Sequence, residues 1–212
     1  SVYRAMVMPA SFLVVLFYAI YLVVRNGVIS YQKASGLAMF SGIVIFCFYS
    51  FIRLKEMLPV EEYGYDAIFF ILLILCFAWG GDTCAYFAGR AFGKHKLCPV
   101  VSPKKTVEGA VGGVLGTMVF GVLVTVIYSI AADRMEEFTR SNIGVSMYVI
   151  IALLACVAAV LGIYGDLFAS VVKRQCGIKD YGTIFPGHGG ILDRFDSVMF
   201  IAPFVTKIGR AS

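Results

Sequence analysis

Three polar residues stand at helical spacing near the end of a long apolar run. Asp166, Ser170 and Lys173 lie at i, i+4 and i+7, so a helix would place them on one face. A carboxylate, a hydroxyl and an ammonium group do not suit a lipid-facing surface, because ionisable groups are expensive inside a bilayer. They do suit a metal ion and a phosphate bound side by side. The alternative for Asp166 is a hydrogen bond to a neighbouring helix.

A glycine-rich turn comes next and leads to two further carboxylates. His188 is followed by Gly189 and Gly190, and glycine lets a backbone approach a ligand closely. The helix that should begin after this turn offers free N–H groups to phosphate. Asp193 and Asp196 fall three residues apart, close enough to bridge metal ions. A solvated loop before an ordinary helix is the alternative, because acidic residues also favour a first helical turn.

A basic segment precedes another apolar run. Lys104 and Lys105 lie in Ser102–Thr106 and could hold phosphate as mobile point charges. Anchoring of the membrane topology explains each lysine, taken singly, equally well. Thr106 is expected to cap the following helix, and Glu108 to complement its dipole.

Asp82 is a second acidic residue expected within a membrane span. Gly81 precedes it, as Gly165 precedes the first acid described above, and such glycines let a backbone or a ligand come close. Intramembrane carboxylates suggest function, although a hydrogen bond to a neighbouring helix accounts for Asp82 equally well. Gly112 and Gly116 form a G-x-x-x-G pattern, which we assign to helix packing.

The chain that carries these residues is strongly apolar. Of its 212 residues, 60% are hydrophobic and 15% are charged, whereas soluble domains are nearer half apolar and a quarter charged. A transmembrane helix needs about 20 mostly apolar residues. Six segments qualify, at about 6–24, 36–52, 67–89, 107–131, 146–173 and 192–208. We predict an all-α polytopic membrane protein with a single catalytic domain over 1–212, in which 1–66 holds N-terminal spans and 67–212 the motif-bearing helices.

The loops between these spans differ in charge. Lys and Arg gather in 25–35, 90–106 and 173–191, whereas 53–66 and 132–145 are rich in acids. The positive-inside rule therefore places the basic loops in the cytoplasm. Because the net charge of +5 is clustered beside apolar spans, a nucleic-acid partner is not expected. The six cysteines form no C-x-x-C pair, which favours small buried residues over a disulfide framework or a zinc site.

The run 170–196 resembles the signature of phosphatidate cytidylyltransferases, also called CDP-diacylglycerol synthases. It carries Ser, Lys-Arg, Lys-Asp, His-Gly-Gly and Asp-Arg-x-Asp elements in the order of that signature. The segments 81–82 and 102–106 resemble more N-terminal motifs of the same family, so the resemblance covers about 78–203. Family members usually carry further N-terminal spans, and this chain looks like a shortened version.

The resemblance implies an enzyme that transfers a cytidylyl group from CTP to phosphatidic acid, giving CDP-diacylglycerol and pyrophosphate for phospholipid biosynthesis. It implies magnesium, in a two-cation site with room for one monovalent ion, bound by Asp166, Asp193 and Asp196, with Asp82 as a further candidate. Lys173 joins these three aspartates as a catalytic residue. The implied substrate contacts are Ser102, Lys104, Lys105, Ser170, Arg174, Lys179, Asp180, His188, Gly189, Gly190 and Arg194. The implied setting is a homodimer in the bacterial inner membrane, among membrane lipids, with the active site facing the cytoplasm.

Other functions are compatible with parts of this pattern. A CTP-dependent lipid kinase or a CDP-archaeol-type synthase would use the same nucleotide. A cation transporter would need polar residues across the full membrane depth, whereas here they crowd toward one side. The D-G-x-x-A-R pattern of CDP-alcohol phosphotransferases does not occur in the sequence.

Overall fold

The computed structural model describes residues 31–134, 144–178, 180, 181, 190 and 192–208, together with isolated residues between 13 and 24. The chain divides into two units, Ser1–Ile45 and Phe46–Ser212. The boundary falls inside the first long helix, α2 (Tyr31–Met57). All the predicted site residues belong to the second unit.

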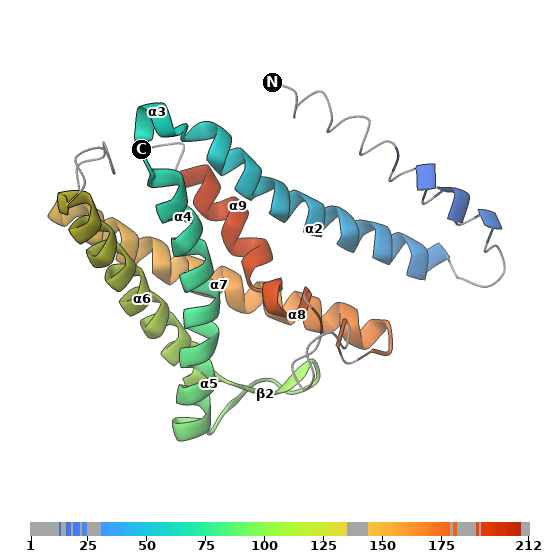
Figure 1. The fold of residues 1–212 in the computed structure, drawn as a ribbon. Coiled ribbons are helices and arrows are strands. Elements are labelled where there is room, and N and C mark those ends of the chain that lie inside the picture. The colour runs from blue at the N-terminus through green and yellow to red at the C-terminus, as the bar shows by residue number, and fades with distance from the viewer. Residues whose placement is uncertain are drawn as a thin grey trace. The chain divides into compact units, whose positions relative to one another are not determined.

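The second unit is helical apart from one short hairpin (Figure 1). After α2 come α3 (Val60–Tyr63) and a continuous rod of α4 (Asp66–Leu75), the π-helical turn η1 (Cys76–Gly80) and α5 (Gly81–Phe92). The hairpin strands β1 (Lys96–Cys98) and β2 (Ser102–Thr106) lead into α6 (Val107–Arg134). The remaining helices are α7 (Val145–Gln175), α8 (Leu192–Phe195) and α9 (Val198–Ile208).

Within the described residues, four helices are long and apolar enough to cross a membrane: Ala38–Met57, Asp66–Phe92, Val107–Arg134 and Val145–Gln175. They match the second to fifth predicted spans and confirm an all-α polytopic membrane protein. The first predicted span lies largely outside the described residues. The sixth differs from the prediction, because α8 and α9 are separated at 196–197 and α9 has 11 residues where a span needs about 20.

Small residues let α6 pack closely against α5. The buried positions of α6 recur every four residues, at Gly109, Gly113, Thr117, Gly121 and Thr125. A Cβ at Gly112 would overlap Ala88 of α5, and one at Gly116 would overlap Cys84. Lipid is as apolar as the side chains, so close backbone approach and not water exclusion favours helix association in a membrane. The predicted packing role of the G-x-x-x-G pair is confirmed.

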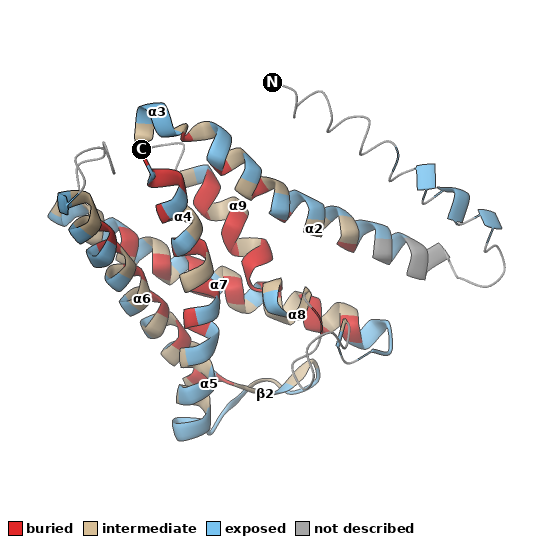
Figure 2. Cartoon of the chain, viewed as in Figure 1, coloured by how far each residue is buried: buried red, intermediate tan, exposed pale blue. Residues whose placement is uncertain are grey.

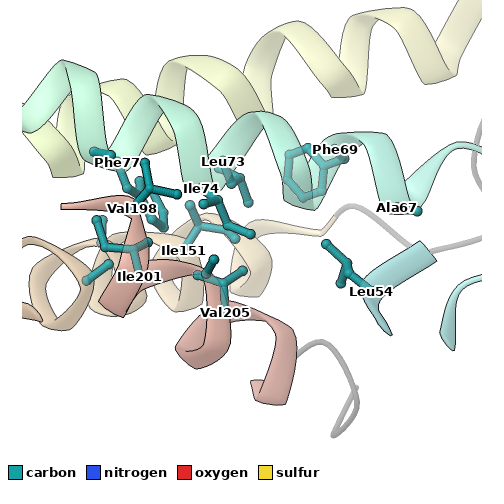
Figure 3. Close-up of a cluster of buried hydrophobic side chains, with 14 of the residues drawn as sticks. Leu54, Ala67, Phe69, Leu73, Ile74, Phe77, Ile151, Val198, Ile201 and Val205 are labelled. Atoms are coloured by element: carbon teal, nitrogen blue, oxygen red, sulfur yellow. The ribbon is translucent and has the colours of Figure 1, made fainter. Parts of the chain in front are cut away.

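The buried core lies where α4, η1, α7 and α9 meet (Figures 2 and 3). Its members include Phe69, Leu73, Ile74, Phe77, Ile151, Val198, Ile201 and Val205. Apolar residues on other faces stay exposed, as Leu115 on α6 and Leu153 on α7 do at 58% and 64%, and these faces suit lipid. Because the core fixes α9 against α7, it also fixes the α8–α9 junction that carries Asp196.

Candidate active site

A cavity of about 550 Å³ lies where α5 ends, α6 begins and α7 ends. Nine predicted site residues line it: Asp82, Lys104, Lys105, Asp166, Lys173, Asp180, Asp193, Arg194 and Asp196. They come from α5, β2, α7, α8 and the loops around α8. The two basic loops 90–106 and 173–191 therefore meet at one end of the bundle in their described parts.

Gly165 allows the α8–α9 junction to approach α7. A Cβ at this position would lie 2.7 Å from the carbonyl oxygen of Asp196 and 3.0 Å from Cδ2 of Phe200. The expected close approach at the glycine before Asp166 is therefore confirmed. This approach brings the carboxylates of Asp166 and Asp196 to the same cavity, although they are 30 residues apart in the sequence.

We expect Gly165→Ala to lower turnover by roughly 10-fold or more while leaving the helical content unchanged. The new methyl group would collide with a backbone carbonyl, so the α8–α9 junction must move, and a shift of about 1 Å at a reacting centre can cost 10²-fold. Gly162→Ala is the matched control on the same helix, because its Cβ would meet the flexible end of Ile201 at 3.0 Å. Turnover assays and circular dichroism test this, and equal activity of the two variants would contradict it.

A lysine from the hairpin neutralises Asp166. Nζ of Lys105 lies 2.5 Å from Oδ2 of Asp166, and the two side chains are 25% and 24% exposed. The hydroxyl of Ser170 donates to Oδ1 of Asp166 over 3.4 Å, so that hydrogen bond is weak. The ion pair joins β2 to α7 beside the cavity. The sequence analysis placed both residues in the site but did not foresee that they would bind each other.

The turn after α7 redirects the chain toward α8. Gly177 has a φ of 71°, a left-handed conformation that glycine adopts without steric cost. The N–H of Gly177 donates to the carbonyl of Arg174 over 3.1 Å, and the N–H of Ile178 donates to that of Lys173 over 3.0 Å. This pair of bonds is the Schellman motif, which satisfies the last carbonyls of a helix. The motif places Lys173 in the final turn of α7, close to the returning chain.

Lys173 and Asp193 organise that returning chain. Nζ of Lys173 donates to Oδ1 of Asp193 over 2.8 Å and lies 4.0 Å from Oδ2 of Asp196. The second oxygen of Asp193 accepts the backbone N–H groups of Tyr181 and Gly190, each over 2.8 Å. Burial acts to raise the pKa of Asp193, but these hydrogen bonds outweigh it and lower the pKa below its usual value. As a carboxylate, Asp193 therefore binds the backbone at Tyr181 and at Gly190.

Tyr181 and Ser197 contact predicted site residues but were not named as candidates in the sequence analysis. The ring of Tyr181 lies 5.2 Å from Nζ of Lys173, within the range of a cation–π interaction. Ser197 is 1% exposed; its hydroxyl donates to Oδ2 of Asp82 over 2.8 Å and its N–H to Oδ1 of Asp196 over 2.9 Å. Tyr181 directly follows the Lys-Asp element and Ser197 directly follows the Asp-Arg-x-Asp element, and this was the available signal. Spacing along the chain does not show which residue a tyrosine or a serine will contact.

The remaining predicted residues have varied positions. Arg174 is exposed at the end of α7, and neither it nor Ser102 nor Ser170 lines the cavity. Gly190 is buried and holds Asp193. The predicted cap is confirmed, because Thr106 Oγ1 accepts the N–H of Gly109 over 3.1 Å. Lys179, His188 and Gly189 lie outside the described residues.

The carboxylates around the cavity are of the chemical kind that magnesium prefers. Burial and the charges of Asp166 and Asp82 raise the pKa of Asp196 to about 7, against the opposing effect of Lys173. A bound cation would relieve this repulsion. In the part of the chain that the structure describes, no three His, Cys, Asp or Glu side chains are gathered as a metal site. Lys105 pairs with Asp166, and Lys173 pairs with Asp193 and lies near Asp196. The magnesium site stays a prediction.

Comparison with known proteins decides the family. A model of the cytidylyltransferase family matches residues 1–211. The chain belongs to this family. It is 32% identical over 198 residues to the phosphatidate cytidylyltransferase of Bacillus subtilis (strain 168), which covers 93% of the chain and 66% of that protein.

Staphylococcal relatives match over a shorter region. The chain is 43% identical over 140 residues to the phosphatidate cytidylyltransferase of Staphylococcus epidermidis (strain ATCC 12228 / FDA PCI 1200), and 40% identical over 140 residues to that of Staphylococcus aureus (strain COL). Each match covers 66% of the chain and 48% of the relative. The chain thus spans between about half and two thirds of the length of these curated relatives. The family resemblance found in the sequence is confirmed.

Proposed function

We propose that this chain carries the catalytic centre of a phosphatidate cytidylyltransferase, which transfers a cytidylyl group from CTP to phosphatidic acid. One observation supports this above all: a cavity at the end of an apolar helical bundle brings Lys104, Lys105, Lys173 and Arg194 together with five aspartates. Both substrates are phosphates, and one of them is a lipid. A reaction between them needs cationic side chains near the boundary of the membrane, and the basic residues of this cavity at one end of the bundle would supply them.

In the proposed reaction a phosphate oxygen of phosphatidic acid attacks the α-phosphorus of CTP. The bond from that phosphorus to the bridging oxygen breaks, and pyrophosphate leaves. A phosphate monoester has a second pKa of about 6, so the attacking group is largely ionised at neutral pH and needs no strong base. The main difficulty is to bring two polyanions together. Lys104 and Lys105 on the hairpin and Lys173 on α7 reduce that repulsion and orient the phosphates.

Magnesium would add to this charge neutralisation at the attacking and leaving oxygens. We propose Asp166, Asp193 and Asp196 as its ligands, with Asp82 as a further candidate. The apolar residues Ala85, Ala110 and Ile163 also line the cavity, which supports entry of the lipid sideways from the bilayer. By the positive-inside rule, the active site would face the cytoplasm of a bacterial inner membrane. Assembly as a homodimer stays a prediction.

Isotope position distinguishes this reaction from its alternatives. Purified protein in mixed micelles is given magnesium, phosphatidic acid and CTP labelled at either the α- or the γ-phosphorus. We expect the α-label, and not the γ-label, in the organic extract, with one pyrophosphate released per CDP-lipid formed. Transfer of the γ-label would indicate a lipid kinase. A strong preference for an ether-linked archaeol phosphate would indicate the archaeol-type synthase, and no lipid label from either position would overturn the proposal.

Lys104 and Lys105 allow a paired prediction, because Lys105 has an ion pair with Asp166. Lys105→Gln and Lys104→Gln each remove one positive charge, so both should raise the KM for CTP, by roughly 3- to 10-fold if each lysine holds phosphate. Lys105→Gln also frees the Asp166 carboxylate, so it should strengthen the stabilisation by magnesium alone in a thermal-shift titration. Lys104→Gln should leave that magnesium response unchanged. Equal magnesium responses in the two variants would contradict this role of Lys105.

A further inference from the structure

Glu108 binds the segment that leads into the hairpin. It lies in the first turn of α6, where its charge was expected to complement the helix dipole. Its carboxylate also accepts the backbone N–H of Lys94 over 3.1 Å and that of His95 over 3.2 Å. The ring Nδ1 of His95 lies 2.6 Å from Oε1 of the same carboxylate. One side chain thus binds three nitrogen atoms of two consecutive residues, which a dipole effect does not require.

The hairpin that follows this segment is short and irregular. Its two strands pair Lys96 with Thr106 and Cys98 with Ser102, with an irregularity between the pairs. A two-stranded hairpin is marginally stable by itself. The N–H of Val107 also donates to the carbonyl of His95 over 2.9 Å, which continues the pairing up to the start of α6. The Glu108 carboxylate therefore binds the chain directly before β1, at the level where β2 continues into α6.

This attachment reaches the cavity through Lys105. Thr106 is 8% exposed, and its hydroxyl accepts the N–H of Gly109, so the end of β2 is fixed to α6. A Cβ at Gly89 would lie 2.9 Å from the same hydroxyl, which shows how closely β2 packs on α5. Lys105 is the residue before Thr106, and its ammonium group pairs with Asp166. If the hairpin were less firmly attached, the ammonium group of Lys105 would therefore occupy a wider range of positions.

We propose that Glu108, with His95, is a positioning residue that holds the hairpin so that Lys105 is presented to the nucleotide phosphates. It touches neither substrate and acts through Lys94, His95 and β2. Its effect is expected on nucleotide affinity more than on the chemical step. The ligand in this inference rests on the proposed function, whereas the attachment of the hairpin does not.

Three variants separate this role from a helix-dipole role. Asp keeps the charge but is one methylene shorter, so Glu108→Asp cannot reach the same nitrogen atoms without movement of the chain. Gln keeps the length and one acceptor oxygen, so Glu108→Gln retains part of the attachment. Glu108→Ala removes both the charge and the acceptor oxygen atoms. A positioning role predicts that Asp behaves like Ala and that Gln is milder, whereas a dipole role predicts that Asp behaves like wild type and Gln like Ala.

Two measurements are needed, and one of them does not depend on activity. Hydrogen exchange of the 94–106 segment reports the attachment, and we expect faster exchange in the Asp and Ala variants with α7 exchanging as in wild type. The KM for CTP should rise by about 5- to 10-fold in those variants, roughly 1 to 1.4 kcal/mol, with kcat changed less than 2-fold. Asp133→Asn, at the far end of α6, is the charge-matched control.

The outcomes separate the two proposals. Wild-type exchange and KM in Glu108→Asp would overturn the positioning role. A raised KM without faster exchange would also overturn it, because Glu108 would then act directly on the ligand. If wild type forms no CDP-lipid, the proposed function fails, and the exchange experiment still decides whether Glu108 holds the hairpin.

Discussion

Asp166→Asn is expected to lower turnover by about 10³-fold or more, because removal of a proposed magnesium ligand would cost several kcal/mol of transition-state stabilisation. Asn keeps the shape of the side chain, so the fold should survive. The substitution leaves Lys105 without its charged partner and removes a carboxylate that α7 contributes to the lining of the cavity. CDP-lipid formation and the magnesium-dependent thermal shift are the two measurements.

The control for this variant is Asp133→Asn, which removes an acid from the far end of α6 and should retain normal turnover. Near-wild-type turnover of Asp166→Asn with a normal magnesium response would contradict a catalytic role. In that case Asp166 would serve helix packing through its ion pair. The same comparison for Asp193→Asn is informative, because protein donors already bind both oxygens of that carboxylate.

Lys173→Met is expected to have the largest effect on stability, about 3–5 kcal/mol, because removal of one partner leaves a buried charge unpaired. The Lys173 side chain is 11% exposed, and those of Asp193 and Asp196 are 7% and 8% exposed. Met matches the length of the lysine stem, so the loss would come from charge and not from packing. Denaturant unfolding in detergent micelles should show a lower midpoint.

A double-mutant cycle makes this prediction specific. Adding Asp193→Asn to Lys173→Met should recover part of the lost stability, because the carboxylate that lost its partner is then neutral. Arg174→Met is the neighbouring control and should have little effect, because Arg174 is exposed. Additive effects of the Lys173 and Asp193 substitutions would show that their ion pair does not stabilise the fold.

The sequence predicted local structure correctly where that structure depends on a single helix or a single turn. Apolar length located four long helices, Thr106 capped α6 as expected, and the glycine before Asp166 allowed the predicted close approach. Hydropathy could not show the break between α8 and α9, because an average over many residues hides one junction. At that junction, Ser197 hydrogen-bonds to Asp82, a residue 115 positions away.

Pairings between distant elements were the part that sequence could not supply. Spacing along one helix says which residues share a face but not what faces them. The lysines of 102–106 were assigned to phosphate, yet one of them also neutralises an aspartate of α7. Glu108 was assigned to a helix dipole, yet it also holds the hairpin. In each case the partner lies on another element, and only the packing of those elements determines which residues meet.

The π-helical turn η1 changes the direction in which side chains face between α4 and α5 of the continuous rod. A π turn accommodates one residue more than an α-helix does, and one residue corresponds to about 100° of rotation about the axis. Before η1, Phe69 and Leu73 face the core, and after it, Asp82 and Ala85 face the cavity. A regular helix of the same length would turn Asp82 to another side. The angular offset of these five residues thus lets a single membrane-crossing rod face the buried core with one half and the cavity with the other.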